Sequence, residues 1–96
     1  MNYFFEWDKQ KASSNLKKHG VTFEDAKTVF NDPYACIFYD EWHSTQEERE
    51  IIIGYDFKNR LLLVCFTQRN QNIRIISSRL ATKKERKNYE QNNKFK

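Results

Sequence analysis

Residues 69–79 read RNQNIRIISSR, a polar turn followed by a strand rich in isoleucine. Asn70, Gln71 and Asn72 are turn formers, and the β-branched residues that follow favour an extended strand. Three arginines fall within these eleven positions. Arginines held on rigid backbone are suited to binding phosphate, whereas on an edge strand the same charges prevent aggregation. The stretch by itself favours neither interpretation.

Further strands precede this one along the chain. We predict four strands, at residues 34–40, 49–57, 60–69 and 73–79. A polar loop at residues 41–48 joins the first two, and Lys58 with Asn59 forms the next turn. Because the connections are short, these strands form an antiparallel meander.

Helical signals lie on both sides of the predicted sheet. Asp8 is a suitable N-cap for a helix to about Lys18, and Gly20 stands where a left-handed C-terminal cap is favoured. Thr22 with Asp25 predicts a second helix, which ends at residues 31–33. On the first helix only Ala12 and Leu16 mark an apolar stripe. Residues 3–7 form a short first strand.

A third helix follows the last strand. Thr82 and Glu85 have the spacing of a capping box, Tyr89 lies on one face of this helix, and residues 91–96 are expected to fray. The predicted fold class is α+β, with residues 1–96 as a single domain. The strands are apolar on both faces, and the short third helix leaves part of one face open to a protein partner.

The composition is that of a folded globular domain, with 39% hydrophobic and 16% aromatic residues, two Gly and one Pro. The longest apolar run, residues 61–66, is too short to span a membrane, and the N-terminus lacks a secretory signal. Cys36 and Cys65 lie in apolar runs and are expected to act as small buried hydrophobes. We therefore predict a cytoplasmic protein without disulfides, metal ligands or a cofactor.

The net charge of +4 conceals an asymmetry along the chain. Residues 1–57 hold six Lys or Arg and eleven Asp or Glu, whereas residues 58–96 hold eleven and two. The two parts therefore carry 6 − 11 = −5 and 11 − 2 = +9. A basic half predicts a polyanionic partner. The alternative is that folding interleaves the two halves and cancels the field.

Nucleophile triads, phosphate-binding glycine loops, paired cysteines and HExxH are all missing from the sequence. What remains is a basic site, and the reaction that suits it is metal-independent RNA cleavage, because RNA supplies its own 2′-hydroxyl nucleophile. His19 follows Lys18 at a helix end, where an imidazole can face a phosphate or simply serve as a helix-end cation. His43 lies in the polar loop and is expected to be solvated.

The expected strand register brings three arginines together. If Phe57 pairs with Arg60, then Arg49 lies opposite Gln68 and beside Arg69. Closing the next turn places Arg74 at the same end of the sheet. Guanidinium groups so close to one another need acids or a bound anion to offset their repulsion, so the cluster indicates an anion site.

Two long stretches also resemble a known family. Residues 5–33, FEWDKQKASSNLKKHGVTFEDAKTVFNDP, are similar to the opening of BrnT-type toxins, with an aromatic-Trp-Asp, a Lys-rich helix and KHGV-F-E-A-VF-DP. Residues 60–90, RLLLVCFTQRNQNIRIISSRLATKKERKNYE, resemble the closing segment, with T-x-R, I-R-I-I-S-x-R-x-A and E-R-x-x-Y. Together the stretches cover most of the chain, in order and at the expected separations.

This resemblance implies a RelE-like fold and a ribonuclease toxin of a type II toxin–antitoxin pair. It also implies neutralisation by a BrnA-type antitoxin, in a hetero-oligomer that binds operator DNA through the antitoxin. The residues predicted to be catalytic are Lys18, His19, Arg49 and Arg69. Those predicted to bind RNA are Arg74, Arg79, Lys83, Arg86 and Tyr89.

Alternatives stay open at this point. Arg79 can instead tie the last strand to the final helix through Glu85 or Glu90. The whole chain can be a non-catalytic subunit of a repressor complex that binds nucleic acid and protein, or a purely structural interaction subunit. A binder retains RNA in a salt-sensitive way without cleaving it, which separates it from a nuclease.

Overall fold

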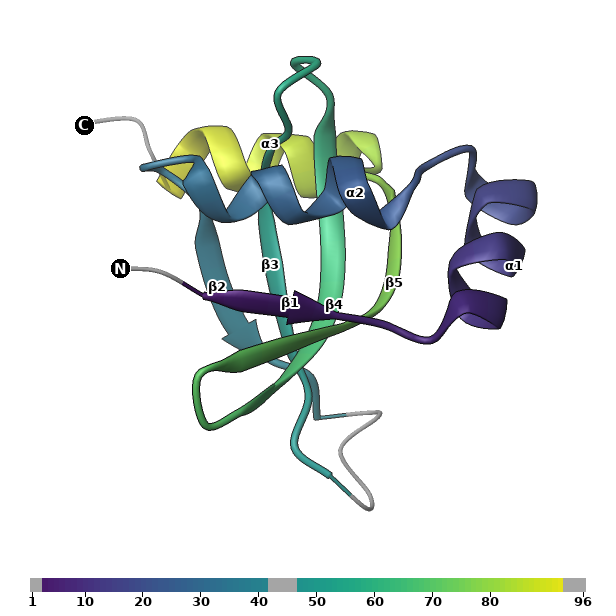
Figure 1. The fold of residues 1–96 in the computed structure, drawn as a ribbon. Coiled ribbons are helices and arrows are strands. Elements are labelled where there is room, and N and C mark those ends of the chain that lie inside the picture. The colour runs from purple at the N-terminus through teal and green to yellow at the C-terminus, as the bar shows by residue number, and fades with distance from the viewer. Residues whose placement is uncertain (1–2, 42–46, 93–96) are drawn as a thin grey trace.

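The computed structural model, which describes residues 3–41 and 47–92, has a five-stranded sheet in the order β1-β5-β4-β3-β2 (Figure 1). The strands are β1 (Phe4–Glu6), β2 (Cys36–Tyr39), β3 (Glu50–Tyr55), β4 (Leu61–Arg69) and β5 (Asn72–Leu80). Strands β2 to β5 pair antiparallel, as the predicted meander requires. The short first strand adds to β5 in parallel, so the sheet is mixed and not a pure meander.

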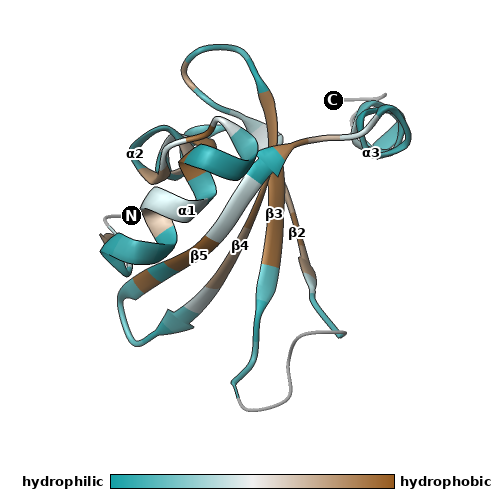
Figure 2. Ribbon diagram, turned by 90° about the vertical axis from the view of Figure 1, so that its right-hand side faces the viewer, coloured by the Kyte–Doolittle hydropathy of each residue, from teal (hydrophilic) through white to brown (hydrophobic). Residues whose placement is uncertain are grey.

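Three helices and one 3-10 segment surround the sheet. They are α1 (Lys9–His19), α2 (Phe23–Ala26), the 3-10 segment η1 (Lys27–Asn31) and α3 (Lys83–Asn92). Figure 2 shows α1 and α2 on one side of the sheet and α3 on the other. We call the side under α1 and α2 the first face and the side toward α3 the second face. The architecture is α+β, as predicted.

The predicted caps are present at all three helices. Asp8 accepts hydrogen bonds from the backbone N–H groups of Gln10 and Lys11 at 2.8 and 3.0 Å. Thr22 caps α2 by accepting from the Asp25 N–H at 3.0 Å. Gly20 ends α1 with a φ of 70°, which only glycine adopts without strain.

Two predicted ends differ in the structure. The second helix continues beyond Ala26 as a 3-10 segment, where the hydroxyl of Thr28 donates to the carbonyl of Asp25 at 2.6 Å. The tail predicted to fray from residue 91 overlaps α3, which runs to Asn92. Residues 93–96 and His43 lie outside the described residues.

The main core fills the space between the first face and the segment from α1 to η1. Its T-shaped aromatic contacts include Phe5 with Phe30 and Trp7 with Phe23, at centroid separations of 5.1 and 5.9 Å. The buried side chains of this core are Val21, Phe23, Ala26, Val29, Ile52, Leu62, Val64, Phe66, Ile73 and Ile75. Burial of about ten apolar side chains, each contributing roughly 1.5–3 kcal/mol, fixes the strands beneath α1.

The second face is covered only at one end. Ile53, Leu61 and Leu63 pack there with Tyr89 of α3. Strand β2, at the edge of the sheet, leaves Ile37, Phe38 and Tyr39 about half exposed. Of these, Phe38 pairs with Ile51 and lies on the second face, so its exposure agrees with the expectation that the third helix leaves part of this face open. No helix in the described part of the chain is long and apolar enough to cross a membrane.

The turn between β3 and β4 is longer than expected, which corrects the strand register. Tyr55 pairs with Leu61, whereas the prediction paired Phe57 with Arg60. Asn59 adopts a left-handed φ of 62°, as in a three-residue hairpin loop. The buried carboxylate of Asp56 accepts from the backbone N–H groups of Lys58 and Arg60 and so stabilises this loop. The register is therefore shifted by one residue.

Candidate active site

Helix α1 closes the exposed edge of β5 beyond the point where β1 ends. The side-chain amide of Asn15 donates to the carbonyl of Ser78 at 2.8 Å and accepts from the Ser78 N–H at 3.0 Å. It also donates to the carbonyl of Val21 at 3.0 Å. Asn15 thus bonds the strand edge as a neighbouring strand would, and Leu16, predicted to be apolar and packed, is 47% exposed instead.

Strand β5 carries an irregularity at Ile76. Cys65 of β4 pairs with Ser77 and the next residue, Phe66, pairs with Ile75, so that Ile76 has no partner in the ladder. Such a bulge bends the strand and redirects its side chains, and bulges are common beside active sites.

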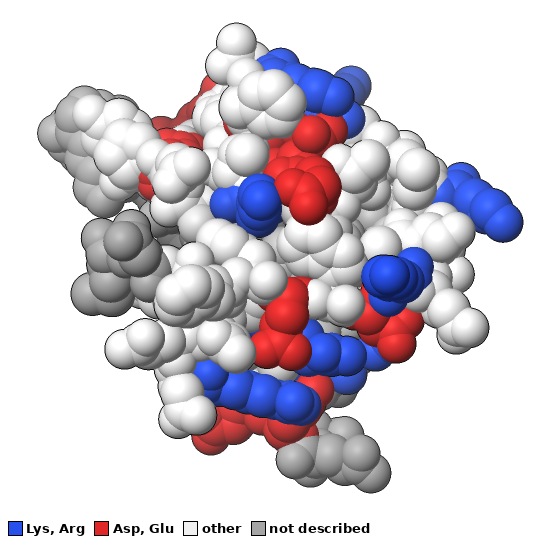
Figure 3. All heavy atoms as spheres, viewed as in Figure 1, with Lys and Arg blue, Asp and Glu red and all other residues white. Residues whose placement is uncertain are grey.

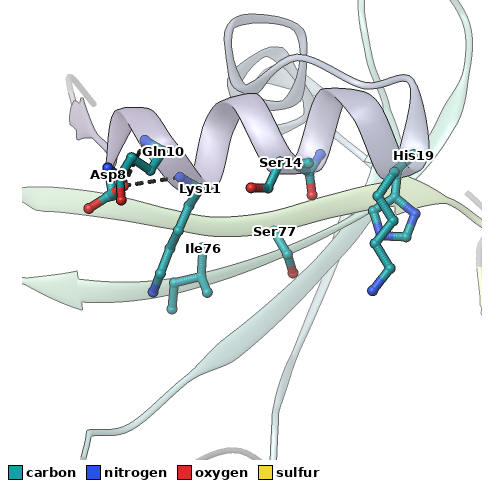
Figure 4. Close-up of a pocket in the computed structure, with 9 residues that line it drawn as sticks. Asp8, Gln10, Lys11, Ser14, His19, Ile76 and Ser77 are labelled. Carbon is teal, nitrogen blue, oxygen red and sulfur yellow. Dashed lines mark hydrogen bonds between the residues drawn. The ribbon is translucent and has the colours of Figure 1, made fainter.

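Two cavities of about 450 Å³ each meet at this bulge. The helix-side cavity lies between α1 and β5 and is lined by Asp8, Gln10, Lys11, Ser14, Asn15, Lys18, His19, Ile76 and Ser77 (Figure 4). The sheet-side cavity is lined by His19, Asp40, Arg49, Ile51, Leu63, Cys65, Ile76, Ser77, Ser78 and Arg79. Because the cavities share His19, Ile76 and Ser77, we describe them together as the β5 groove.

His19 stands at the junction of the two cavities. It is the last residue of α1, and Lys17, Lys18 and His19 together fill the final turn, where cations are favoured by the helix dipole. Lys18 lines the helix-side cavity with it, whereas Lys17 lines neither cavity. The structure therefore brings the predicted residues Lys18 and His19 to one groove.

Arg49 and Arg79 lie in the sheet-side cavity with His19. The two terminal nitrogens of Arg79 donate to the two carboxylate oxygens of Glu85 at 2.8 and 2.9 Å. This bidentate pair raises the pKa of Arg79 and lowers the pKa of Glu85 to about 2. Arg79 accordingly ties β5 to α3, which was the alternative interpretation, and its charge is largely offset.

Cys65 lines the sheet-side cavity together with the apolar Ile51 and Leu63. Its thiol donates to the Oδ2 of the buried Asp40 at 3.8 Å. Burial, with the negative charge of Asp40, raises the pKa of Cys65 to about 11. A thiol with this pKa is protonated at neutral pH and is not a nucleophile. Cys36 and Cys65 are free thiols that are only partly buried, not fully buried as predicted.

The predicted arginine cluster forms at the far end of β4, although the register that predicted it was wrong. Extending the observed register by one residue sets Arg49 beside Thr67, and Thr67 pairs with Arg74. The hydrogen bond from Arg69 to Glu47, at 2.7 Å, lowers the pKa of Glu47, as do the charges of Arg49 and Arg74. All three guanidinium groups therefore lie near one carboxylate.

Acids of the protein already offset this cluster. Besides the pair between Arg69 and Glu47, Arg74 pairs with Glu6 at 3.0 Å. The repulsion that indicated an anion site is thus relieved from within the chain. Neither Arg69 nor Arg74 lines the β5 groove, so the structure brings the predicted catalytic residues Lys18, His19 and Arg49 to the groove and leaves Arg69 outside it.

The other predicted RNA-binding residues lie on α3. Lys83 is exposed, and Arg86 donates to the hydroxyl of Tyr55 at 3.1 Å. Tyr89 is only 7% exposed, and its hydroxyl donates to Asp32 at 2.8 Å, which with burial raises its pKa. Tyr89 therefore anchors α3 and has no exposed ring face for a base to stack on.

The acidic and basic halves of the chain interleave. Asp25 of the first half pairs with Lys58 and Arg60 of the second, at 3.0 and 2.9 Å. The pairs of Glu6 and Glu47 with arginines also join the halves. Figure 3 shows the two charge signs side by side on one side of the molecule. Folding therefore interleaves the acidic and basic halves, as the alternative interpretation held. Where a cation lies on the molecule matters more than the net positive charge of residues 58–96.

Several groove residues were not identified from the sequence. Lys11 and Ser14 lie at helical spacing from the predicted Lys18 on one face of α1, and this spacing was the available signal. Asp40 and Ser77 could not have been identified from the sequence, because only the fold brings the end of β2 and the strand β5 to one cavity. Within the described residues, no group of three or more His, Cys, Asp or Glu side chains is arranged to hold a metal ion.

Comparisons with known proteins agree with the sequence resemblance. The model of a family described as the ribonuclease toxin BrnT of type II toxin–antitoxin systems matches residues 7–85. The crystal structure of the Brucella abortus ribonuclease toxin BrnT superposes with a TM-score of 0.67 at 24% sequence identity. The alignment covers 85% of this chain and 100% of that one, and it shows a common fold. No curated protein sequence matches the chain.

Proposed function

The chain belongs to the BrnT family of ribonuclease toxins of type II toxin–antitoxin systems, and from this premise we propose that it cleaves RNA without a metal ion in the sheet-side cavity of the β5 groove. The observation that carries the proposal is that His19 and Arg49, 30 positions apart in sequence (49 − 19), line one cavity of about 450 Å³. One residue supplies an imidazole and the other a fixed positive charge. The first group can transfer protons and the second can stabilise phosphoryl charge, and both effects accelerate phosphodiester cleavage in RNA.

The reaction follows from the chemistry of the substrate. The 2′-oxygen of the RNA attacks the adjacent phosphorus while the bond from phosphorus to the 5′-oxygen breaks. This leaves a 2′,3′-cyclic phosphate and a 5′-hydroxyl, and the proton lost by the 2′-hydroxyl is balanced by the proton gained at the 5′-oxygen. His19 transfers the proton, Lys18 assists beside it, and Arg49 stabilises the charge that grows on the phosphoryl oxygens.

Arg69 has a different role in this proposal. It lies outside the groove and is paired with Glu47, so it contacts the RNA backbone at a distance from the cleaved bond. Arg74, Lys83 and Arg86 have the same kind of role, because the phosphate backbone dominates nucleic-acid affinity. Arg79 positions α3 beside the cavity.

Cleavage of an end-labelled RNA, with and without a chelator, tests the proposal. We expect discrete products that persist in chelator. His19→Gln and Arg49→Ala should each slow cleavage on the order of 10²-fold, because each removes a group that acts in the transition state. Arg49→Lys should restore little activity, because an ammonium does not reproduce the planar guanidinium contact.

Lys17→Ala is the matched control for this experiment. Lys17 lies in the same last turn as His19 but lines neither cavity, so its loss should change the rate less than about threefold. A larger loss in Arg69→Ala than in Arg49→Ala would move the reaction to the arginine cluster. RNA that is bound but left intact would favour the non-catalytic binding subunit.

As a toxin of a type II system, the protein has a cognate antitoxin partner. We propose that a BrnA-type antitoxin covers the open part of the second face and the edge strand β2. The DNA-binding part of the antitoxin carries the complex to operator DNA. Both proteins act in the cytoplasm. The half-exposed side chain of Phe38 supports this surface on the second face, and Ile37 and Tyr39 present half-exposed apolar side chains on the other side of the same edge strand. Covering it would also block the sheet-side cavity.

Co-purification with the antitoxin tests this surface. Ile37→Asp and Phe38→Asp should weaken capture at least tenfold, because each places a charge in an apolar interface. Leu16→Asp, an equally exposed apolar residue on α1, is the control and should leave capture unchanged. Equal capture by all three variants would place the antitoxin elsewhere.

A further inference from the structure

Apart from Lys18 and His19, the residues that line the helix-side cavity take no part in the reaction described above, yet they form an ordered lining. Lys11, Ser14 and Lys18 are three and four residues apart, so their side chains lie along one face of α1. At 1.5 Å per residue, Lys11 and Lys18 are separated by about 10 Å along the helix axis. Two cations thus flank a hydroxyl along one wall of the cavity.

The opposite wall comes from β5 at its bulge. Ile76 and the exposed Ser77 line the cavity from β5. Figure 4 shows their side chains on the side of the strand away from α1, with Lys11 reaching past the strand toward Ile76 near one end of the helix and His19 at the other end. The two walls are held together by the pair of hydrogen bonds between Asn15 and Ser78. The cavity is therefore built between two elements that are rigidly joined, which favours a preformed binding site.

The charge of this lining is positive. Lys11 and Lys18 line the cavity, and the one acid among its lining residues is Asp8. The Asp8 carboxylate already accepts two backbone N–H groups at 2.8 and 3.0 Å, which stabilises it in place as the helix cap and lowers its pKa. Hydroxyl and ammonium donors in a row suit phosphate oxygens.

We propose that the helix-side cavity binds the sugar–phosphate backbone of single-stranded RNA next to the cleaved bond. Lys11 and Lys18 contact successive phosphates along the strand, and Ser14 and Ser77 donate hydrogen bonds to the same backbone. The proposal rests on the function above, since it extends the substrate from the sheet-side cavity through His19. On this proposal the RNA strand crosses β5, and it must be long enough to reach from the sheet-side cavity into the helix-side cavity.

Two features favour RNA over an acidic protein segment as the occupant. The cavity adjoins the reaction cavity at three shared residues, so a strand held at one lies beside the other. Its donors are spaced along a line, as the phosphates of a nucleic-acid strand are, and it reads no base edges. Binding should therefore depend on salt and little on sequence.

Binding of a fluorescent single-stranded RNA with every 2′-hydroxyl methylated, which prevents cleavage, tests the proposal. Lys11→Gln should weaken binding about three- to tenfold at low salt and reduce the slope of log affinity against log salt by about 0.7, the value for one phosphate contact on a single strand. Lys9→Gln, on the exposed side of the same helix, is the charge-matched control and should leave both quantities near wild type.

Substrate length provides a second measurement. Lys11→Gln should raise KM for a long RNA several-fold and leave kcat and the cleavage of a dinucleotide unchanged, because a dinucleotide does not reach Lys11. Equal binding and KM for Lys11→Gln and Lys9→Gln would overturn the proposal while leaving the cleavage site intact. Loss of dinucleotide cleavage in Lys11→Gln would also overturn it. If the wild-type chain cleaves no RNA, the proposed cleavage activity is contradicted. The binding measurement with the methylated RNA still tests whether the helix-side cavity binds the RNA backbone.

Discussion

At the residue scale, the side-chain amide of Asn15 joins α1 to the edge of β5. It is 6% exposed and makes three hydrogen bonds, to the backbone of Ser78 on both its N–H and its carbonyl and to the carbonyl of Val21. Without it, the N–H and carbonyl of Ser78 would be buried and unsatisfied at the edge of β5. A neutral hydrogen bond adds little to the free energy of unfolding, but a buried polar group left without a partner lowers it substantially.

We therefore expect Asn15→Ala to lower the free energy of unfolding by about 3 kcal/mol, the cost of stranding these backbone groups. Asn15→Asp should be at least as destabilising at neutral pH, because a carboxylate would face two carbonyl oxygens with no proton to donate. Urea unfolding measures both, with Ser13→Ala on the exposed side of α1 as the control. A midpoint for Asn15→Ala equal to that of Ser13→Ala would show that water replaces the amide.

At the element scale, α3 is docked by polar contacts as much as by packing. Glu85 completes the capping box by accepting from the Thr82 N–H at 2.8 Å, and the same carboxylate binds Arg79 of β5. Tyr89 packs edge-on against Tyr55 at a centroid separation of 5.6 Å and bonds Asp32. One helix of ten residues is thus held against one end of the second face, which leaves the sheet-side cavity open beside it.

The position of α3 should depend on pH through Glu85. Its pKa falls from 4.5 to about 2 on folding, so its contribution to stability is complete above about pH 4.5 and is lost as the pH falls toward 2. Allowing for solvent screening, we expect about 1 kcal/mol. Melting curves between pH 2 and 7 should show Glu85→Gln less stable than wild type at neutral pH, with the difference closing as the pH falls. Glu90→Gln, on the same helix, is the control; a difference that persists at pH 2 would contradict the assignment.

At the scale of the whole molecule, folding changes what the charge distribution means. The acidic and basic halves of the sequence predict two separate fields, but ion pairs between Asp25 and Arg60, and between Glu6 and Arg74, bring the halves together. Lys11 and Lys18 on α1, by contrast, line the β5 groove. An anion is therefore attracted to a particular groove and not to a basic half.

Much of the fold was predictable because it rests on local chemistry. Asp8, Thr22 and Thr82 have side chains that bond backbone N–H groups two or three residues away, so the helix starts can be read from short stretches. The register of β3 and β4 could not be predicted, because it depends on whether the buried Asp56 closes a two- or a three-residue turn. The arginine cluster was predicted in spite of that error, since the three residues lie near the same end of the sheet.

The candidate site was likewise predictable only in part. The sequence by itself determined the family, the α+β class, the helix that ends in Lys18 and His19, and the absence of the motifs of other enzyme classes, because these depend on residue identity and short-range spacing. The tertiary structure alone decided that His19 and Arg49 share a cavity, that Arg79 is committed to Glu85, and that Arg69 is offset by Glu47. The physical reason is that ion pairs and cavities join residues far apart in sequence, and a one-residue change in a turn is enough to redirect them.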